Sequence, residues 1–325
     1  MGDHDLDTDT MRTLRFHHYG EPADVLALET VPVPIPGPGA IRVVVRACGL
    51  APADWALCRG LLPGQLPRGV GCDVSGTVDA VGDDVTDIAV GDLVFGTTDW
   101  ANQPSAGASG RAIMDRWFAV PEGLDPTQAA ALPMALSTAY WHLARLGLDR
   151  DKTILVHGAG TTVGFAAVQI ALIRGMRVLA TSGGTYATQL EDLGATVTAY
   201  GDGLVDRVQG ISGGRVDMVL DTAPVSGALP ELIQIADGDP KRVLTISDFA
   251  AAAQLGARDT FHEDPAAWTE TERFGFFPEF AQLAAKGKFA IPIAGTFPLE
   301  DWRRALEVSL GGHAHGKLVL LPTDG

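Results

Sequence analysis

The stretch TILVHGAGTTVG, from Thr153 to Gly164, decides the fold of this chain. Its first four residues, 153–156, are apolar or β-branched and predict a short buried strand, which ends at His157. A turn rich in glycine follows the strand, and a mostly apolar segment of helical length, residues 165–173, follows the turn. A strand, a Gly-rich turn and a helix form a cradle for phosphate, because backbone N–H groups and the positive end of the helix dipole face the anion.

Three glycines punctuate the turn at Gly158, Gly160 and Gly164. Glycine suits a phosphate cradle because any Cβ would hold the pyrophosphate away from the backbone. The dinucleotide fingerprint is G-x-G-x-x-G, and here the third glycine falls one place late. The spacing alone therefore leaves an ordinary strand–helix turn as the alternative to a dinucleotide site.

The alternation of strand and helix continues after this turn. Residues 177–181 predict the next strand after a single helix, as a βαβ unit requires. Further strands are predicted at 196–200, 216–222 and 242–247, with helical stretches between them. This pattern predicts an α/β fold with a doubly wound parallel (Rossmann) sheet and helices on both of its faces.

The composition is that of a globular protein. The chain has 325 residues, of which 46% are hydrophobic and 20% charged, and its formal net charge is −16. Such an acidic protein is repelled by nucleic acid and by anionic lipid, so we expect neither as a partner. No apolar run approaches the roughly 18 residues of a membrane span, and we see no signal peptide. Three cysteines without a Cys-x-x-Cys pair indicate free thiols in a reducing compartment, and we expect a cytoplasmic protein.

The N-terminal part has a different pattern. Residues 1–10 are polar and acidic and predict a disordered leader. Short strands at 41–46, 74–81 and 91–96 are separated by turn signals, which suggests a small β-barrel. Residues 97–111 are rich in Ser, Gly, Ala and Asn and predict a mobile loop.

The last part of the chain returns to mixed structure. We expect helices at 278–285 and 299–310, a short edge strand with a proline at 289–293, and a closing strand at 317–321. Earlier in the chain, the alanine-rich region 127–146 predicts a helix that Pro133 interrupts.

These patterns predict three divisions of the chain. After the leader, residues 11–124 and 270–325 form the barrel domain, and residues 125–269 form the Rossmann domain.

A series of ordered motifs carries a family resemblance. The motifs are ACGLAPAD at 47–54, GVGCDVSGTV at 69–78, GDLVF at 91–95, Leu132-Pro133 with Thr138-Ala-Tyr140, VHGAGTTVG at 156–164, LGA at 193–195 and GKLVL at 316–320. In these motifs the chain resembles the zinc-free, NADPH:quinone oxidoreductase-like branch of the medium-chain dehydrogenase/reductase superfamily. The resemblance runs from about Arg12 to the C-terminus. It implies a GroES-like barrel domain, a nucleotide domain, a cleft between them for NADP(H) and a small electrophilic substrate, and a homodimer.

The chain departs from the superfamily at several positions. The resemblance places the zinc-binding cysteine of the alcohol dehydrogenases at Ala51 and their His-Glu pair at Cys72-Asp73. Alanine cannot bind a metal, and the two remaining groups make a poor zinc site, so we predict no metal. The same branch usually has glycine where Thr161 and Thr162 stand. The two threonines crowd the pyrophosphate but add hydroxyl donors.

The second Rossmann strand carries the evidence for the cofactor. An acidic residue at its end would bind the ribose 2′-hydroxyl of NAD, but the strand ends at Thr181 and residues 182–190 contain no acidic residue. The same stretch has no Arg or Lys, so a surface loop without phosphate preference is the alternative. We favour NADP, with the hydroxyls of Ser182 and Thr185 as phosphate contacts. Tyr200 stands where related sequences place a ring near the adenine, or it packs on the core. The predicted cofactor-binding residues are Gly158, Ala159, Gly160, Thr161, Thr162, Val163, Gly164, Thr181, Ser182, Gly183, Tyr200, Thr222 and Ile246.

Three residues are candidates for catalysis. The resemblance places Thr138 beside the nicotinamide and matches Asp54 to an aspartate in the cleft of the family. Asp54 has a structural alternative, since an aspartate near a Pro-containing turn commonly caps it. Tyr140 is a candidate proton donor, with packing in the helix as its alternative.

The sequence therefore predicts a zinc-independent, NADPH-dependent oxidoreductase that transfers hydride to a quinone or an α,β-unsaturated carbonyl. Conjugation delocalises the charge that develops on such substrates, so that no Lewis acid is required. Two alternatives stay open: a zinc-free carbonyl or tailoring reductase on the same fold, and an NADPH-binding sensor without catalysis.

Overall fold

The computed structural model of the chain describes residues 9–100, 102–260, 268–312 and 314–322. Most of the predicted disordered leader lies outside these residues. Its last residue, Thr10, instead begins strand β1 (Thr10–Phe16) and is paired with Pro32.

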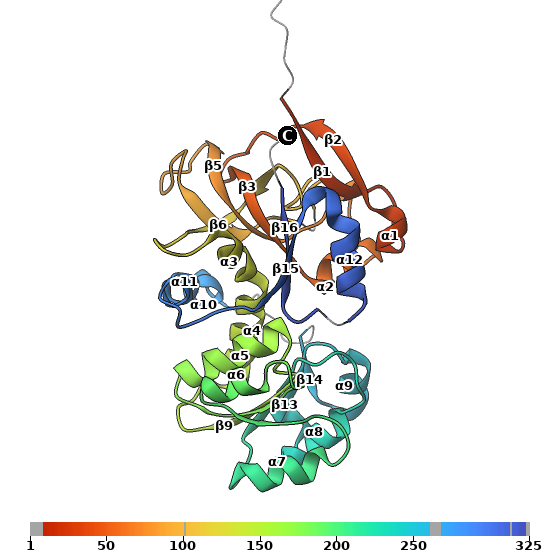
Figure 1. Cartoon of the computed structure of the whole chain (residues 1–325), viewed down its shortest axis with the longest axis vertical. Helices are drawn as coiled ribbons and strands as arrows, with labels where there is room; N and C mark the ends of the chain where they lie inside the picture. Colours follow the sequence, from red (N-terminus) through yellow and green to blue (C-terminus); the bar gives the residue numbers. More distant parts are fainter. Residues whose placement is uncertain (1–8, 101, 261–267, 313, 323–325) are drawn as a thin grey trace, which may run out of the picture. The chain divides into compact units, whose positions relative to one another are not determined.

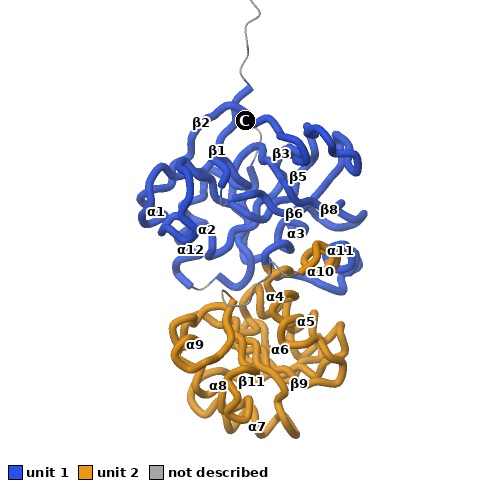
Figure 2. Tube along the Cα trace, turned by 180° about the vertical axis from the view of Figure 1, so that it is seen from behind, with its two compact units in different colours: residues 1–134, 277–325 blue, residues 135–276 orange. Residues whose placement is uncertain are grey.

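The chain divides into two compact units (Figure 2). Unit 1 comprises residues 1–134 and 277–325, and unit 2 comprises residues 135–276. The C-terminal segment from Phe277 thus belongs to the same unit as the N-terminal segment, and the boundaries differ from the expected 124/125 and 269/270.

Unit 1 contains a mixed sheet with the strand order β15-β16-β3-β5-β6-β8, in which β7 also pairs with β3. The strands are β3 (Ile41–Leu50), β5 (Asp73–Val81), β6 (Leu93–Thr97), β7 (Arg111–Met114), β8 (Arg116–Ala119), β15 (Ile293–Pro298) and β16 (Lys317–Leu321). A second sheet has the order β2-β1-β4, with β2 at Ala27–Pro32 and β4 at Arg68–Gly69. The antiparallel pairing of β3 with β16 connects two segments from opposite ends of the sequence.

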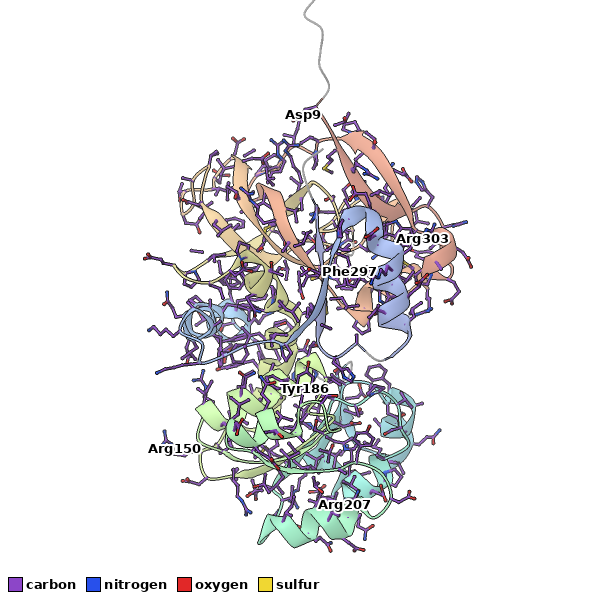
Figure 3. All side chains as sticks on the ribbon, viewed as in Figure 1. Asp9, Arg150, Tyr186, Arg207, Phe297 and Arg303 are labelled. Carbon is purple, nitrogen blue, oxygen red and sulfur yellow. The ribbon has the colours of Figure 1, made fainter. Side chains whose placement is uncertain are left out.

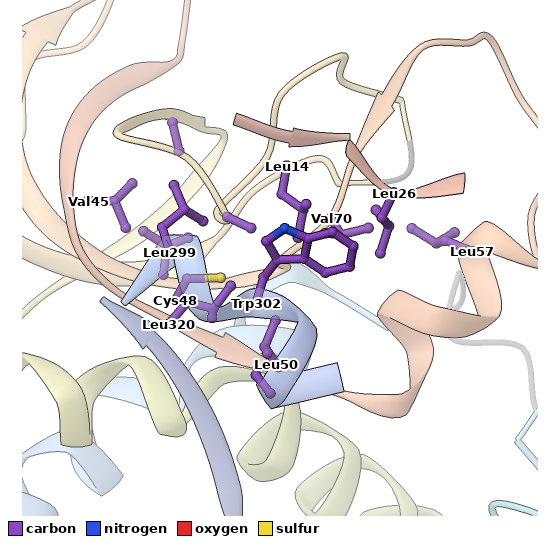
Figure 4. Packing of buried hydrophobic residues seen from close by; sticks show 14 of the residues in the cluster. Leu14, Leu26, Val45, Cys48, Leu50, Leu57, Val70, Leu299, Trp302 and Leu320 are labelled. Atoms are coloured by element: carbon purple, nitrogen blue, oxygen red, sulfur yellow. The ribbon is translucent and has the colours of Figure 1, made fainter. Parts of the chain in front are cut away.

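Unit 1 also has short helices and a buried apolar core. Its helices are α1 (Pro22–Val25), α2 (Pro52–Cys58), α3 (Pro126–Ala131), α11 (Phe277–Ala285), the 3-10 turn η3 (Leu299–Asp301) and α12 (Trp302–Leu310). Figure 4 shows the ring of Trp302 among buried side chains that include Leu14, Leu26 and Val70. Helix α12 therefore fixes the C-terminal segment to the N-terminal strands through apolar burial.

Two expectations for unit 1 are wrong. The predicted strand at 289–293 is irregular backbone, and the strand is β15, which starts at Ile293. Its register begins after Pro292, which has no N–H to donate, although its carbonyl accepts from the Lys317 amide. The predicted mobile loop is anchored over 105–109, where the amide of Ala108 donates to Val70 and its carbonyl accepts from Leu14.

Unit 2 is built on a parallel sheet with the strand order β11-β10-β9-β12-β13-β14. The strands are β9 (Thr153–His157), β10 (Arg177–Thr181), β11 (Thr196–Thr198), β12 (Met218–Asp221), β13 (Val243–Thr245) and β14 (Arg258–Asp259). Every residue of β9 is buried, which is the environment expected of a central strand in a parallel sheet. This order confirms the predicted doubly wound sheet.

Helices alternate with these strands along unit 2 (Figure 1). They are α5 (Thr162–Ile173), α6 (Ala187–Asp192), α7 (Leu204–Ser212), α8 (Leu229–Ile235), the 3-10 turn η1 (Pro240–Arg242), α9 (Phe249–Leu255) and α10 (Glu270–Phe274). The predicted interruption at Pro133 is confirmed, since α3 ends at Ala131 and helix α4 (Pro133–Leu146) begins at the proline. Among the described residues, none of the helices is both long and apolar enough to cross a membrane.

Candidate functional site

The Gly-rich turn joins the carboxyl end of β9 to the start of α5. Thr161 is the N-cap of this helix, and its hydroxyl accepts a hydrogen bond from the amide of Gly164 at 3.0 Å. The same hydroxyl donates to Oγ1 of Thr222 at 3.2 Å. The Thr161 side chain is therefore engaged inside the turn and supports it. The sequence analysis missed this role, although threonine is a preferred N-cap residue and Thr161 stands directly before the first residue of α5.

Three backbone amides at the start of α5 have no protein acceptor among the described residues: Gly160, Thr162 and Val163. A Cβ built on Gly160 would meet the Ser182 hydroxyl at 3.3 Å and the Tyr186 ring at 3.7 Å. Unpaired N–H groups at the N-terminus of a twelve-residue helix attract an anion. The turn thus fits the diphosphate of a dinucleotide.

Two successive hydrogen bonds connect the Gly-rich turn to Thr181 and His157. The Gly158 amide donates to the Thr181 hydroxyl at 3.0 Å, and that hydroxyl lies 2.8 Å from Nδ1 of His157. Because a hydroxyl can accept two hydrogen bonds and donate one, either neutral tautomer of the His157 ring satisfies this contact. Burial lowers the pKa of His157 to about 4, in agreement with this arrangement. Gly158 itself cannot carry a side chain, because a Cβ there would lie 2.5 Å from the amide nitrogen of Ala223.

The end of β10 lies beside the turn. Ser182 is buried, and its hydroxyl donates to the carbonyl of Gly183 at 3.0 Å. Tyr200 is 62% exposed, and its ring lies close to Gly183, since a Cβ on that glycine would be 3.6 Å from the Tyr200 hydroxyl. These residues form a polar surface with an exposed aromatic ring and no acidic side chain in the segment 181–184.

The next two strands bring further predicted residues to the same edge of the sheet. The Thr222 hydroxyl donates to the carbonyl of His157 at 2.9 Å. The amide of Ile246 donates to the carbonyl of Asp221 at 3.0 Å. Asp221, which the sequence analysis did not select, is buried, accepts from the Thr245 hydroxyl at 2.9 Å, and has its pKa raised by burial to about 6.

Unit 1 contains a buried polar cluster. The ammonium of Lys317 lies 2.6 Å from Oδ2 of Asp73, and both side chains are almost fully buried. Oδ1 of Asp73 accepts from the amide of Met134, in the first turn of α4. Burial opposes the charge on Lys317, but the adjacent Asp73 carboxylate outweighs it and raises the pKa of the ammonium. A lysine that begins the apolar strand KLVLL is the sequence signal that could have revealed this pair.

Asp54 lies in α2 and is fully buried. Its two oxygens accept from the amides of Ala51 at 2.8 Å and Gly71 at 2.7 Å, so that both are occupied by backbone donors. Burial raises the pKa of Asp54 to about 6, and the two amides oppose this shift. The geometry favours the capping alternative, while a catalytic role for Asp54 stays a prediction.

The donor set of this cluster does not suit zinc. Ala51 has no ligand atom, and the oxygens of Asp73 are held by the Lys317 ammonium and the Met134 amide. Within residues 9–322, so far as they are described, there is no group of three or more His, Cys, Asp or Glu side chains arranged to hold a metal ion. The Lys317 ammonium already provides the positive charge that balances the Asp73 carboxylate.

The remaining candidates, Thr138 and Tyr140, lie on α4. The carbonyl of Thr138 accepts from Nδ1 of His142, and its side chain is half-buried. The Tyr140 ring stacks on Phe276 with centroids 4.0 Å apart, and the Arg174 guanidinium lies 5.7 Å from its centre. Packing therefore accounts for the position of Tyr140, and its role as a proton donor stays untested.

Two family models match the chain. The alcohol dehydrogenase GroES-like domain matches residues 37–124, and the zinc-binding dehydrogenase domain matches residues 193–320. The first model and the parallel sheet together confirm the predicted fold class.

Relatives and solved structures agree with these models. The human quinone oxidoreductase is 27% identical over 96% of this chain and 98% of its own length. A mycocerosic acid synthase-like polyketide synthase of Mycolicibacterium smegmatis is 31% identical over 94% of this chain, which corresponds to 15% of that protein. The structure of the quinone oxidoreductase of Coxiella burnetii has a TM-score of 0.80 at 25% identity and covers 97% of this chain and 100% of its own.

Proposed function

Because this chain belongs to the medium-chain dehydrogenase/reductase superfamily and is a quinone oxidoreductase-like member of it, we propose that it is a zinc-independent, NADPH-dependent reductase of quinones or α,β-unsaturated carbonyls. As a member of this family it is an oxidoreductase that uses a nicotinamide cofactor. The observation that carries the proposal is the turn at Gly160 to Val163, whose unpaired amides fit a diphosphate.

The preference for NADPH rests on the end of β10. An acidic side chain there would repel a 2′-phosphate, and residues 181–184 contain none. The exposed ring of Tyr200 next to Gly183 offers a surface for the adenine. We propose that the Ser182 and Thr185 hydroxyls contact the 2′-phosphate.

In the proposed mechanism the residues of this chain mainly bind the cofactor and orient it toward the substrate. The amides of Gly160, Thr162 and Val163 hold the diphosphate, and Thr181 keeps the turn in place through Gly158. When bound, the nicotinamide supplies a hydride. We propose that Thr138 lies beside the reacting ring and that solvent returns the proton to the product. Proximity and orientation then account for most of the acceleration.

The proposed substrate class rests on side chains that do not suit a zinc ion, since Ala51 has no side-chain ligand atom and Asp73 is held by Lys317 and Met134. A quinone or a conjugated carbonyl spreads the developing negative charge over several atoms, whereas a simple ketone concentrates it on one oxygen. We propose a conjugated electrophile on this ground, and the human relative is a quinone oxidoreductase.

Stopped-flow oxidation of NADPH against a panel of quinones, enones and simple ketones tests the proposal. We expect turnover with the conjugated substrates, no effect of chelators, and a weaker apparent affinity for NADH. Product analysis of an enone distinguishes reduction of C=C from reduction of C=O. Binding of NADPH by calorimetry without turnover on any substrate would contradict the enzyme assignment and favour the sensor. We also propose a homodimer, which light scattering after size exclusion tests.

A further inference from the structure

The loop after β11 carries Tyr200, and the side chains of this loop are not held by burial. Residues 199–203 are all exposed, and Gly201 and Gly203 adopt the left-handed backbone conformation, with φ of 88° and 75°. Tyr200 itself is 62% exposed. An exposed ring on such a loop is fixed only if its backbone is fixed.

The side chain of Arg207 holds the backbone of this loop. It lies in α7, where Figure 3 labels it, and its guanidinium folds back over the loop. Nη2 donates to the carbonyl of Ala199 at 3.1 Å and to that of Gly201 at 2.9 Å, and Nη1 donates to the carbonyl of Asp202. The two acceptors at 199 and 201 are the carbonyls on either side of Tyr200.

No other hydrogen-bond donor reaches these three carbonyls in the part of the chain that the structure describes. An arginine fork suits the task, since its planar donors can serve several carbonyls at once. Its Nε is buried and unpaired among the described residues, so the side chain gives up solvation to hold the loop.

We propose that Arg207 is a positioning residue of the adenosine site, which orients the Tyr200 ring by clamping the carbonyls around it. The inference rests on the proposed function, because it presumes that Tyr200 faces the adenine. In this role Arg207 contacts no part of the cofactor and acts only through the loop. A misplaced ring loses its stacking on the adenine base, which weakens binding by about tenfold.

Calorimetry with adenosine 2′,5′-bisphosphate and with 5′-AMP tests the proposal on the whole chain. We expect Arg207→Gln to weaken the binding of both probes by about tenfold, and Arg207→Lys by less, because lysine keeps the charge and part of the donor set. Equal loss for both probes separates positioning of the ring from a direct contact with the 2′-phosphate. A different result would overturn the proposal in favour of a direct contact with the 2′-phosphate. In that result Arg207→Gln leaves 5′-AMP binding unchanged, and Arg207→Lys restores the binding of adenosine 2′,5′-bisphosphate.

A double-mutant cycle with Tyr200→Ala shows whether Arg207 acts through Tyr200. We expect the double variant to bind no more weakly than Tyr200→Ala alone, whereas additive losses would contradict the inference. Arg215→Gln is the matched control, since Arg215 is 62% exposed, forms an ion pair with Asp237 at 3.4 Å, and lies in the same unit. Binding of nicotinamide mononucleotide and the melting temperature are measured for each variant and should not follow the loss of adenosine binding.

The outcomes separate the inference from the function on which it depends. If the unaltered protein binds neither adenosine probe nor NADPH, the proposed function fails and the inference fails with it. If the unaltered protein binds both probes and Arg207→Gln binds them equally well, the inference alone is overturned.

Discussion

At the scale of single residues, the adjacent threonines Thr161 and Thr162 have different roles in the Gly-rich turn. Thr161 turns its hydroxyl onto the Gly164 amide and Thr222, so it stabilises the protein itself. The Thr162 hydroxyl has no partner among the described residues and stands at the first position of α5, next to the unpaired amides. Of the two threonines that the sequence analysis expects to crowd the pyrophosphate, Thr161 therefore stabilises the turn itself.

We predict that Thr161→Ala and Thr162→Ala separate stability from cofactor binding. Loss of the Thr161 cap should lower the free energy of unfolding by about 1 kcal/mol. Thr162→Ala should leave that free energy within about 0.5 kcal/mol but weaken NADPH binding about fivefold, since one donor to the diphosphate is lost. Urea unfolding and calorimetry measure the two quantities. The reverse pattern would show that the two hydroxyls have exchanged roles.

Asp54 is a second prediction at this scale. Asp54→Ala leaves the amides of Ala51 and Gly71 buried without an acceptor, which should cost about 1–3 kcal/mol for each amide. If Asp54 is a cap, kcat per folded molecule should stay within about threefold, whereas loss of a general acid or base typically costs about 100-fold or more. Denaturation curves and active-site-normalised kinetics, both at low temperature, distinguish these roles.

At the scale of elements, the buried ion pair connects the starts of two strands of unit 1 with Met134, the last residue of that unit before α4 continues into unit 2. Lys317 begins β16, Asp73 begins β5, and the same carboxylate accepts from Met134 in the first turn of α4. A negative charge near the start of a helix is favourable for its dipole. Gly49 makes room for the arrangement, because a Cβ there would lie 2.7 Å from Cε of Lys317.

We predict that Lys317→Met lowers the free energy of unfolding by about 3–5 kcal/mol, because it leaves Asp73 buried without a counter-charge. The double variant with Asp73→Asn should lose less than the sum of the single losses. Arg59→Met is the control, since Arg59 and Glu21 form an exposed pair worth less than about 1 kcal/mol. Additive losses for Lys317 and Asp73 would contradict the coupling.

The raised pKa of Lys317 sets the direction of its pH dependence. Its contribution to stability is fully present below the unfolded lysine pKa of about 10.4 and is lost as pH rises through the higher folded value. Alkaline unfolding of the unaltered protein should therefore show a step that Lys317→Met lacks.

Most elements of the fold were predictable because they follow local rules. β10 and β16 start and end where the apolar runs 177–181 and 317–321 do, and α4 starts at the proline that cannot continue a preceding helix. The strand predicted at 289–293 is wrong, because Phe289 and Ile291 are apolar and buried but do not pair with a neighbouring strand. Apolar content reports burial, and burial does not require a strand.

At the scale of the whole molecule, each unit contains a buried carboxyl whose pKa is raised to about 6: Asp54 in unit 1 and Asp221 in unit 2. The unfolded value is about 3.9, so between roughly pH 4 and pH 6 the folded state binds more protons than the unfolded state. The free energy of unfolding should fall as pH rises through this window, by up to about 1.4 kcal/mol per pH unit for each group.

Asp221→Asn tests this prediction. The variant should lose the part of the slope that Asp221 contributes, so that its stability depends less on pH between about 4 and 6 than that of the unaltered protein. Urea midpoints measured across that range give the slope directly. An unchanged slope would show that Asp221 is ionised as readily in the folded state as in the unfolded state.

Local patterns in the amino-acid sequence were sufficient to predict the parallel sheet and the Gly-rich turn between β9 and α5. These follow from local patterns of apolar residues, glycines and prolines, which act over a few neighbours. Three contacts are visible only in the folded chain: two amides hold Asp54, Lys317 pairs with Asp73 across 244 residues of sequence, and Arg207 clamps the loop of Tyr200. Such partners come from distant strands or from a side chain that folds back, and their energies depend on burial that no local pattern contains.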